Sequence, residues 1–228
     1  MASVIQWNCR GLQPRRNDLQ LLIHDQNPCV IALQETKLKG KETISGFPRY
    51  KPYRENYEAG QIACGGVALM VRKDLIQEEI ELKTPIQAVA VRVTLHGRPT
   101  SVVSMYLPPQ ARPIRQRHLK ELLQQIPTPR LILGDLNAHN PIWGGRSRDH
   151  RGALIEQLLL DENLILFNNG KHTYEKPDGT GSSALDLCVG DPVLGIEYEW
   201  DVLPDKYGSD HFPTTPPKSQ KWIQYLQF

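Results

Sequence analysis

The stretch Leu131-Ile-Leu-Gly-Asp-Leu-Asn137 joins an apolar run to a pair of polar residues, and this arrangement recurs along the chain. Short apolar runs rich in β-branched residues are typical of strands, and here they predict strands at 4–7, 30–33, 66–71, 88–95, 101–106, 131–134, 164–167 and 185–189. Helical periodicity predicts helices over 18–24, 115–126 and 151–162. Because the strands are mostly paired in sequence, we expect an α/β protein with mixed sheets covered by helices, not a regular βαβ repeat.

The length and composition are those of one soluble domain. The chain has 228 residues, of which 39% are hydrophobic and 23% charged, which excludes a disordered or fibrous protein. No apolar run reaches the roughly 20 residues of a membrane span, and the N-terminus does not resemble a signal peptide. We therefore expect a soluble, intracellular protein without a membrane partner. The net charge of +2 neither requires nor excludes a nucleic-acid partner.

The four cysteines, Cys9, Cys29, Cys64 and Cys188, form no CxxC pair. Their spacing predicts neither a zinc site nor a redox motif, and a chain that builds its own core needs no disulfide framework. We expect four free thiols. After Pro213 the chain has the composition of a linker, so the folded unit is expected to span 1–213, with 214–228 as a tail. Residues 222–228 are apolar enough to dock somewhere.

Polar residues gather where the predicted strands end, and strand ends are where side chains converge on a shared cleft. They are Asn8, Glu35, Asp135, Asn137, Asp186, Asp210 and His211. Carboxylate and amide oxygens are hard ligands that suit Mg²⁺ or Mn²⁺. A carboxylate beside a histidine fixes the imidazole tautomer and favours its charged form. This combination is typical of phosphate-ester hydrolysis, in which a metal ion and a hydrogen-bond donor stabilise charge on the phosphate.

Each signal also has a structural interpretation. A lone glutamate such as Glu35 is usually a solvated carboxylate, and Gly-Asp-Leu-Asn at 134–137 could be a turn held by Asx hydrogen bonds. Ser-Asp-His at 209–211 could be a loop with a helix cap. Tyr106 could be a tyrosine at the edge of the core. His118, His139 and His172 are expected to be surface or structural residues.

Taken in order, the segments resemble the endonuclease/exonuclease/phosphatase superfamily, and within it the endonuclease domain of LINE-type (non-LTR), jockey-like retrotransposons. The matching pieces are Ile5-Gln-Trp-Asn-Cys-Arg-Gly11, Ile31-Ala-Leu-Gln-Glu-Thr36, Gly65-Gly-Val-Ala-Leu69, Val103-Ser-Met-Tyr-Leu-Pro-Pro109, Leu133-Gly-Asp-Leu-Asn-Ala-His139, Trp143-Gly144, Ser183-Ala-Leu-Asp186 and Tyr207-Gly-Ser-Asp-His-Phe212. The resemblance covers residues 4–213 and is specific as an ordered set. It implies a four-layer α/β sandwich of the DNase I type, with two mixed sheets face to face and helices outside.

The resemblance also implies a role for each site residue. Glu35, with Asn8 beside it, would bind Mg²⁺, for which Mn²⁺ would substitute. Asp135 would align or deprotonate the attacking water and Asn137 would orient it. Tyr106 would lie near the phosphate. Asp186 would orient His211, which would contact the phosphate, while Asp210 would serve the metal or the leaving group.

The implied reaction is nicking of double-stranded DNA, which leaves a 3′-hydroxyl and a 5′-phosphate. The 3′-hydroxyl would prime reverse transcription of the element's RNA by a reverse transcriptase downstream in the full polyprotein. The chain would then be an excised N-terminal domain, made in the cytoplasm and acting in the nucleus. One departure from the family pattern is Thr214-Thr-Pro-Pro217, where a closing strand is usual. Because prolines are poor in a central strand, either that strand is very short or the chain continues as linker.

Substrate contacts are predicted for Lys176 and Ser183, which flank a short hairpin loop, for Ser209, and for Arg146 and Arg148. An exposed turn without DNA contact is the other interpretation of the loop. Arg146, Arg148 and Arg151 could instead cap the helix predicted at 151. Three other functions remain open: a repair-type abasic-site endonuclease, a phosphatase on inositol lipids or a sphingomyelin hydrolase, and a DNA-targeting module without activity.

Overall fold

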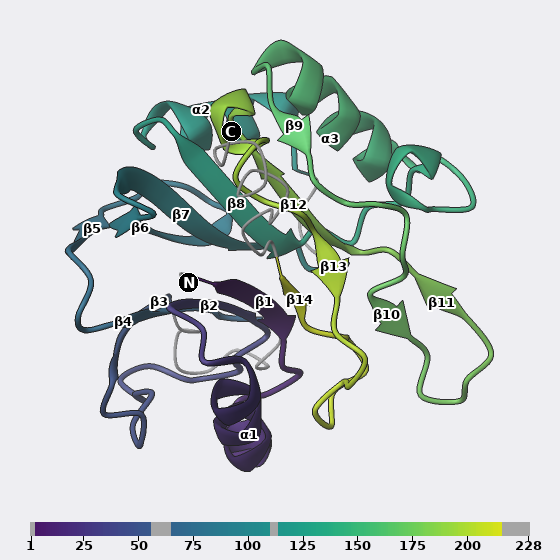
Figure 1. The fold of residues 1–228 in the computed structure, drawn as a ribbon. Helices are drawn as coiled ribbons and strands as arrows, with labels where there is room; N and C mark the ends of the chain where they lie inside the picture. The colour runs from purple at the N-terminus through teal and green to yellow at the C-terminus, as the bar shows by residue number, and fades with distance from the viewer. Residues whose placement is uncertain (1–2, 56–64, 110–113, 216–228) are drawn as a thin grey trace, which may run out of the picture.

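Two mixed six-stranded sheets pack face to face and carry helices on their outer faces, which gives four layers (Figure 1). The computed structural model describes residues 3–55, 65–109 and 114–215. The strand order is β13-β14-β1-β2-β4-β3 in the first sheet and β5-β6-β7-β8-β12-β9 in the second. A separate hairpin of β10 and β11 projects beside the two sheets. The expected four-layer α/β architecture is confirmed.

The elements have the following bounds. The first sheet contains β1 (Val4–Asn8), β2 (Val30–Gln34), β3 (Tyr50–Glu55), β4 (Val67–Arg72), β13 (Asp201–Val202) and β14 (Thr214–Thr215). The second contains β5 (Gln77–Ile80), β6 (Gln87–Leu95), β7 (Arg98–Tyr106), β8 (Arg130–Asp135), β9 (Ile165–Leu166) and β12 (Asp186–Gly190), and the hairpin contains β10 (Tyr174–Glu175) and β11 (Ser182–Ser183). The helices are α1 (Arg16–Gln26), α2 (Gln116–Gln124) and α3 (His150–Asp161), with short 3-10 helices η1 (Gln13–Arg15), η2 (Pro141–Trp143) and η3 (Pro192–Leu194).

The alternation of side chains along β1 explains why its sheet is buried on both faces. Val4 belongs to the core between the two sheets, whereas Ile5 and Trp7 pack on the opposite face with Leu19 and Leu22 of α1. A strand covered on both faces has a continuous apolar sequence, because all of its side chains are buried. The second sheet is covered in the same way by α2 and α3 (Figure 1). All but one of the predicted apolar runs are therefore inner strands; the exception is β9, at the edge of the second sheet.

All eight predicted strands and all three predicted helices form, with ends that shift by a few residues. Sequence reasoning missed β3, β5 and β13, and it left β14 open as one of two alternatives. β3 and β5 are edge strands, and their sequences, Tyr-Lys-Pro-Tyr-Arg-Glu and Gln-Glu-Glu-Ile, are mostly polar. An edge strand has few neighbours to bury its side chains, and polar residues there also discourage pairing with other chains. Its apolar signal is correspondingly weak.

The chain forms a very short strand after Pro213, the first of the two expected alternatives. β14 pairs with β1 through Gln6 and Thr214, and with β13 through Thr215 and Asp201. Residues 216–228 lie outside the described residues, so the linker-like tail and the apolar segment 222–228 remain predictions. Among the described cysteines, Cys9, Cys29 and Cys188 are free and buried, and Cys64 falls outside the described residues. Across the described ranges, no helix combines the length and apolarity needed to cross a membrane.

Candidate active site

Strand register brings the predicted site residues to the same end of both sheets, at the edge where these strands end or begin. Parallel pairing of β1 and β2 places Asn8 opposite Gln34, the residue before Glu35. Parallel pairing of β7 and β8 places Tyr106 opposite Asp135. β12 runs antiparallel to β8 and begins where β8 ends, so Asp186 lies opposite Asp135. Residues far apart in the sequence therefore converge because their strands end or begin at the same level.

Asn8 links the two carboxylates at the centre of this edge. Its Nδ2 donates to Oε1 of Glu35 at 3.2 Å and to Oδ2 of Asp135 at 2.8 Å. Its Oδ1 accepts the backbone N–H of Arg10 at 3.1 Å, and the side chain is fully buried. Its nitrogen thus faces the two carboxylates and its oxygen accepts from the backbone, and the metal role expected for Asn8 stays a prediction.

Glu35 is held as an ionised carboxylate. The Tyr106 hydroxyl donates to its Oε1 at 2.9 Å, and Nζ of Lys37 lies 3.1 Å from its Oε2. Burial acts to raise the pKa of Glu35, but the hydrogen bonds from Asn8 and Tyr106 and the charge of Lys37 outweigh it and hold that pKa below its ordinary value. Tyr106 therefore contacts Glu35, and its place near the phosphate stays a prediction.

Two site residues occupy the left-handed region of backbone space. Glu35 has φ +50° and Asn137 has φ +46°. Asparagine tolerates this region, but for glutamate the conformation is strained by about 1 kcal/mol. The strain is held in place by the backbone, because the carbonyl of Glu35 accepts the N–H of Gly11 at 2.7 Å. The turn directs the Glu35 side chain to Asn8 and Tyr106.

Asp135 and Asn137 form the Asx turn that the sequence allowed at 134–137, and they also lie at the candidate site. The Asn137 N–H donates to Oδ1 of Asp135 at 3.1 Å, which is an Asx hydrogen bond, and its Nδ2 donates to the Leu107 carbonyl at 3.2 Å. Asp135 is 1% exposed. Burial raises the pKa of its carboxyl well above the ordinary value, although the charge of His211 opposes this. Asp135 can thus exchange a proton near neutral pH.

His211 lies between two aspartates. Its Nδ1 is 2.7 Å from Oδ2 of Asp186, and its Nε2 is 3.9 Å from Oδ2 of Asp135. Burial alone would lower the pKa of His211, but the charge and hydrogen bond of Asp186 raise it to about 9. The imidazole is therefore protonated on both nitrogens near neutral pH. Its Nε2–H can donate to a phosphate oxygen.

The carboxylates that would bind a divalent ion are paired with cations. Nη1 of Arg10 lies 3.2 Å from Oδ2 of Asp210, and Lys37 pairs with Glu35 as described above. Ionised oxygen ligands that already attract cations are the donor set that Mg²⁺ or Mn²⁺ prefers. Asp135, Asp186 and His211 also offer ligand atoms within 4.8 Å of one another. The metal role predicted for Glu35 and Asp210 stays a prediction.

The structure brings together only three of the five residues predicted to bind DNA. Arg146, Lys176 and Ser183 line a polar cavity of about 310 Å³ between the segment after η2 and the β10–β11 hairpin. Nε of Arg148 instead lies 2.8 Å from a carboxylate oxygen of Glu156 on α3. The Ser209 hydroxyl is buried and donates to the Asn8 carbonyl at 2.7 Å. This hydroxyl connects the His211 segment to β1, and DNA contact by Ser209 stays a prediction.

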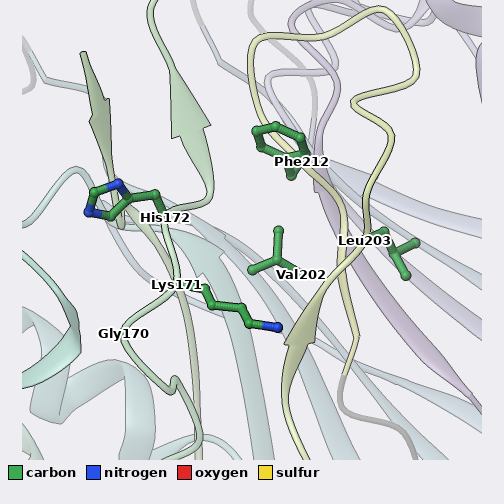
Figure 2. A pocket seen from close by; sticks show the side chains of 6 residues that line it. All are labelled: Gly170, Lys171, His172, Val202, Leu203 and Phe212. Atoms are coloured by element: carbon green, nitrogen blue, oxygen red, sulfur yellow. The ribbon is translucent and has the colours of Figure 1, made fainter.

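A second cavity, of about 330 Å³, lies beside Phe212 (Figure 2). Its lining is Gly170, Lys171, His172, Val202, Leu203 and Phe212. Phe212 directly follows His211 but faces this cavity, since successive residues of an extended segment point to opposite sides. Nζ of Lys171 pairs with Asp201 at 2.5 Å, and Nδ1 of His172 lies 2.6 Å from the Ser182 hydroxyl. None of the predicted catalytic residues lines this cavity.

Several residues at the site escaped sequence reasoning. Gln6, Arg10 and Lys37 contact Asp186, Asp210 and Glu35, respectively. A usable signal existed for Gln6, because it is a polar residue inside an apolar strand and shares a face with Asn8 two residues later. Arg10 and Lys37 gave no signal of their own, because a cation near a motif is usually solvated. The sequence allows Arg151 as a helix cap, but its guanidinium donates to the backbone carbonyls of Leu107 and Pro108 at 2.9 and 3.0 Å.

A family model and several similar proteins place this chain in the same family. The sequence model of the family described as "Endonuclease-reverse transcriptase" matches residues 100–215. A "Probable RNA-directed DNA polymerase from transposon BS" of Drosophila melanogaster is 28% identical over 220 residues, which are 92% of this chain and 23% of that protein. The "RNA-directed DNA polymerase from mobile element jockey" of the same species is 24% identical over 232 residues, covering 96% of this chain and 25% of that protein. This chain thus spans about a quarter of the length of these relatives.

Solved structures agree on the fold. The endonuclease domain of TRAS1, a telomere-specific non-LTR retrotransposon, superposes with a TM-score of 0.80 at 20% identity, covering 95% of this chain and 98% of that domain. The AP endonuclease LMAP from Leishmania major gives 0.73 at 15% identity, covering 96% and 88%. These similarities show the DNase I-like fold of AP endonucleases. Because the family match extends over more than half of the sequence, from Thr100 to Thr215 of 228 residues, the chain belongs to the endonuclease–reverse transcriptase family.

Proposed function

We propose that this chain is a DNA endonuclease that hydrolyses a phosphodiester of duplex DNA. The observation that carries the proposal is the placement of His211 between Asp186 and Asp135, with Asn8 linking Asp135 to Glu35. This arrangement offers a base, a hydrogen-bond donor for a phosphate oxygen and a hard-ion ligand within one connected network. Its place at an edge shared by both sheets, next to the β10–β11 hairpin, suits a long polymeric substrate.

In this proposal Asp135 receives the proton of the attacking water. A carboxylate with a raised pKa is a stronger base than an ordinary one, and its working pH approaches neutrality. The backbone N–H of Asn137 fixes Oδ1 of Asp135, while Nδ2 of Asn8 fixes Oδ2. The carboxylate plane is thus set before substrate binds. Asn137, adjacent to this carboxylate, would orient the water.

His211 would stabilise negative charge on the phosphate. Asp186 holds Nδ1, which leaves the Nε2–H directed toward Asp135 and the space where the phosphate would lie. A pre-oriented charged donor of this kind typically lowers an activation barrier by a few kcal/mol. Because the imidazole is buried and paired, it needs little rearrangement when charge develops.

Glu35 and Asp210 would hold Mg²⁺, or Mn²⁺ in its place. When bound, such an ion supplies positive charge to a phosphate oxygen and to the departing oxygen. Asn8 and Tyr106 hold the carboxylate of Glu35 in one orientation for this purpose. Lys37 and Arg10, which pair with the two carboxylates here, would then be available to the DNA backbone.

Cleavage of the P–O3′ bond would leave a 3′-hydroxyl and a 5′-phosphate. The printed names of the relatives describe RNA-directed DNA polymerases of mobile elements, and such an enzyme needs a primer hydroxyl. We infer that the nick primes reverse transcription of the element's RNA by a polymerase in the same polyprotein. The substrate would be double-stranded chromosomal DNA, so the reaction would take place in the nucleus.

The experiment that tests this function is nicking of a supercoiled plasmid with Mg²⁺, with Mn²⁺ and with EDTA. We expect open circles only with a metal ion, ends that a DNA polymerase extends and a DNA ligase seals, and loss of nicking in Asp135→Asn and Asp210→Ala. Asp74→Asn, an exposed carboxylate in the turn after β4, is the matched control. Nicking that persists in EDTA or in Asp135→Asn would refute the mechanism. A strong preference for an abasic duplex would favour the repair-type alternative.

A further inference from the structure

A buried glutamine lies behind the Asp186–His211 pair. Gln6 lies on β1 between Ile5 and Trp7 and is 1% exposed. Its Nε2 donates to Oδ1 of Asp186 at 2.8 Å, and its Oε1 accepts the Thr214 hydroxyl at 3.2 Å. Burying an amide costs free energy unless its donor and acceptor are both bonded. Both the nitrogen and the oxygen of this amide are hydrogen-bonded, and the nitrogen bonds to Asp186, a residue of the candidate site.

Gln6 completes the hydrogen bonding of the Asp186 carboxylate. Oδ2 of Asp186 bonds Nδ1 of His211 at 2.7 Å, and Oδ1 bonds Gln6. A carboxylate held at one oxygen can still turn about its side-chain bonds, whereas one held at both oxygens has a fixed plane. That plane fixes the direction of the Nδ1–H bond and therefore the direction in which Nε2 of His211 points.

Asp186 and Thr214 together hold the amide of Gln6. The carboxylate oxygen of Asp186 accepts, so Nε2 faces it, and Oε1 is left to accept the Thr214 hydroxyl. The reverse orientation would place Oε1 against the carboxylate oxygen. Thr214 reaches this position because β14 pairs with β1, where Thr214 lies directly opposite Gln6. The two-residue strand after His211 therefore has a chemical contact with the site as well as a backbone one.

We propose that Gln6 is a positioning residue, which acts through Asp186 to hold Nε2 of His211 toward the phosphate, with Thr214 holding the oxygen of its amide. The inference rests on the proposed phosphodiesterase reaction for its effect on rate, but the hydrogen-bonded chain exists without it. Gln6 supplies a neutral donor, so it orients Asp186 without competing with His211 for its charge. A purely structural glutamine would fill space on β1 and have no effect specific to Asp186.

The first test is kinetic and uses matched variants. Gln6→Met keeps the length of the side chain and removes both hydrogen bonds, while Thr214→Val removes only the hydroxyl. We expect Gln6→Met to lower kcat for nicking by about tenfold to a hundredfold with KM within about twofold, because the lost interaction acts in the transition state. Thr214→Val should lower kcat less, by about threefold to tenfold, and add little in the double variant.

A double-mutant cycle separates positioning from packing. If Gln6 acts through Asp186, Gln6→Met should cost nothing further in an Asp186→Ala background. An equal loss of kcat in both backgrounds would overturn the proposal, as would an unchanged kcat in folded Gln6→Met. If Gln6→Met does not fold, Thr214→Val carries the same cycle, and additive losses with Asp186→Ala would overturn the proposal.

The second test needs no nuclease activity. The Nδ1 proton of His211 should give a downfield NMR signal in the free protein, because it is buried and bonded to a carboxylate. We expect its exchange with water to be at least about tenfold faster in Gln6→Met and faster also in Thr214→Val, since a loosened Asp186 opens more often. Unchanged exchange in both variants would refute the positioning role. A wild-type chain that shows this signal but never nicks DNA would refute the proposed function instead.

Discussion

Oδ2 of Asp186 lies 2.7 Å from Nδ1 of His211, and both side chains are at least nine-tenths buried. The two residues are 25 positions apart in the sequence; Asp186 begins β12 of the second sheet, and His211 lies just before β14 of the first. The pair therefore joins the two halves of the sandwich at the site. The charge state of His211 and the direction of its free nitrogen both depend on this one hydrogen bond.

Asp186→Asn should remove most of the activity. The amide cannot balance the charge of the imidazolium, so the pKa of His211 should fall and its donor should weaken. We expect kcat for plasmid nicking to fall by about a hundredfold to ten-thousandfold with little change in KM. The measurement is single-turnover nicking with Mg²⁺. Normal kcat in a folded Asp186→Asn variant would exclude the pair from the reaction.

Stability should fall as pH rises through the range in which His211 titrates. Its pKa is raised from 6.5 to about 9, so its contribution to the free energy of unfolding is fully present below pH 6.5 and is lost as pH rises through 9. The shift corresponds to at most about 3 kcal/mol. The raised pKa of Asp135 acts in the same direction but in a lower pH range. Urea unfolding from pH 6 to 10 in EDTA measures the slope, and His211→Asn should flatten it above pH 6.5.

Tyr106→Phe should weaken metal binding and leave the fold intact. The phenol donates to Glu35, and a hydrogen bond to a charged group is typically worth about 1.5–3 kcal/mol. Without it the pKa of Glu35 should rise toward its ordinary value, so less carboxylate is ionised at acid pH. The lost hydrogen bond leaves the carboxylate free to turn, so we expect about threefold to tenfold more Mg²⁺ to be needed for half-maximal nicking at pH 7, and a larger difference at pH 5, where the proton also competes for Glu35. An equal Mg²⁺ requirement at both pH values, matching wild type, would contradict this.

Lys176→Ala and Arg146→Ala should weaken DNA binding uniformly. Both residues line the polar cavity beside the β10–β11 hairpin. Each lost phosphate contact should reduce the slope of log affinity against log salt by about one and leave kcat unchanged. Lys73→Ala is the control, because Lys73 follows β4, which pairs antiparallel with β2 and so ends far from the site edge. A slope altered equally by Lys73→Ala would show that the effect is not local.

Arg151→Lys should destabilise the protein without changing the salt dependence of DNA binding. The guanidinium donates to backbone carbonyls of the segments that follow β7 and β8, among them those of Leu107 and Leu136. A lysine ammonium cannot donate to these carbonyls in the same planar geometry, so we expect a loss of about 1–3 kcal/mol in the free energy of unfolding. Urea unfolding checks the loss. A reduced salt slope in this variant would instead indicate that Arg151 contacts phosphate.

The sequence by itself determined the central strands, the three helices and the identity of most site residues. Strands buried on both faces must be apolar, so β8 and β12 could be predicted from their apolar runs. The polar residues that interrupt those runs, Asp135 and Asp186, indicated the candidate site. Edge strands such as β5 carry no such signal, because their side chains remain in water. Family resemblance then assigned the order of the motifs and the reaction they imply.

Only the tertiary structure decided which atoms meet. The amide of Asn8 turns its nitrogen to the carboxylates, Ser209 bonds to the backbone of β1, and Gln6 reaches Asp186 across 180 residues of sequence. Hydrogen-bond partners depend on the register between strands and on the packing of one sheet against the other, and residue order alone does not specify either. The Asp186–His211 pair was therefore predictable as two residues, whereas its support by Gln6 and Thr214 was not.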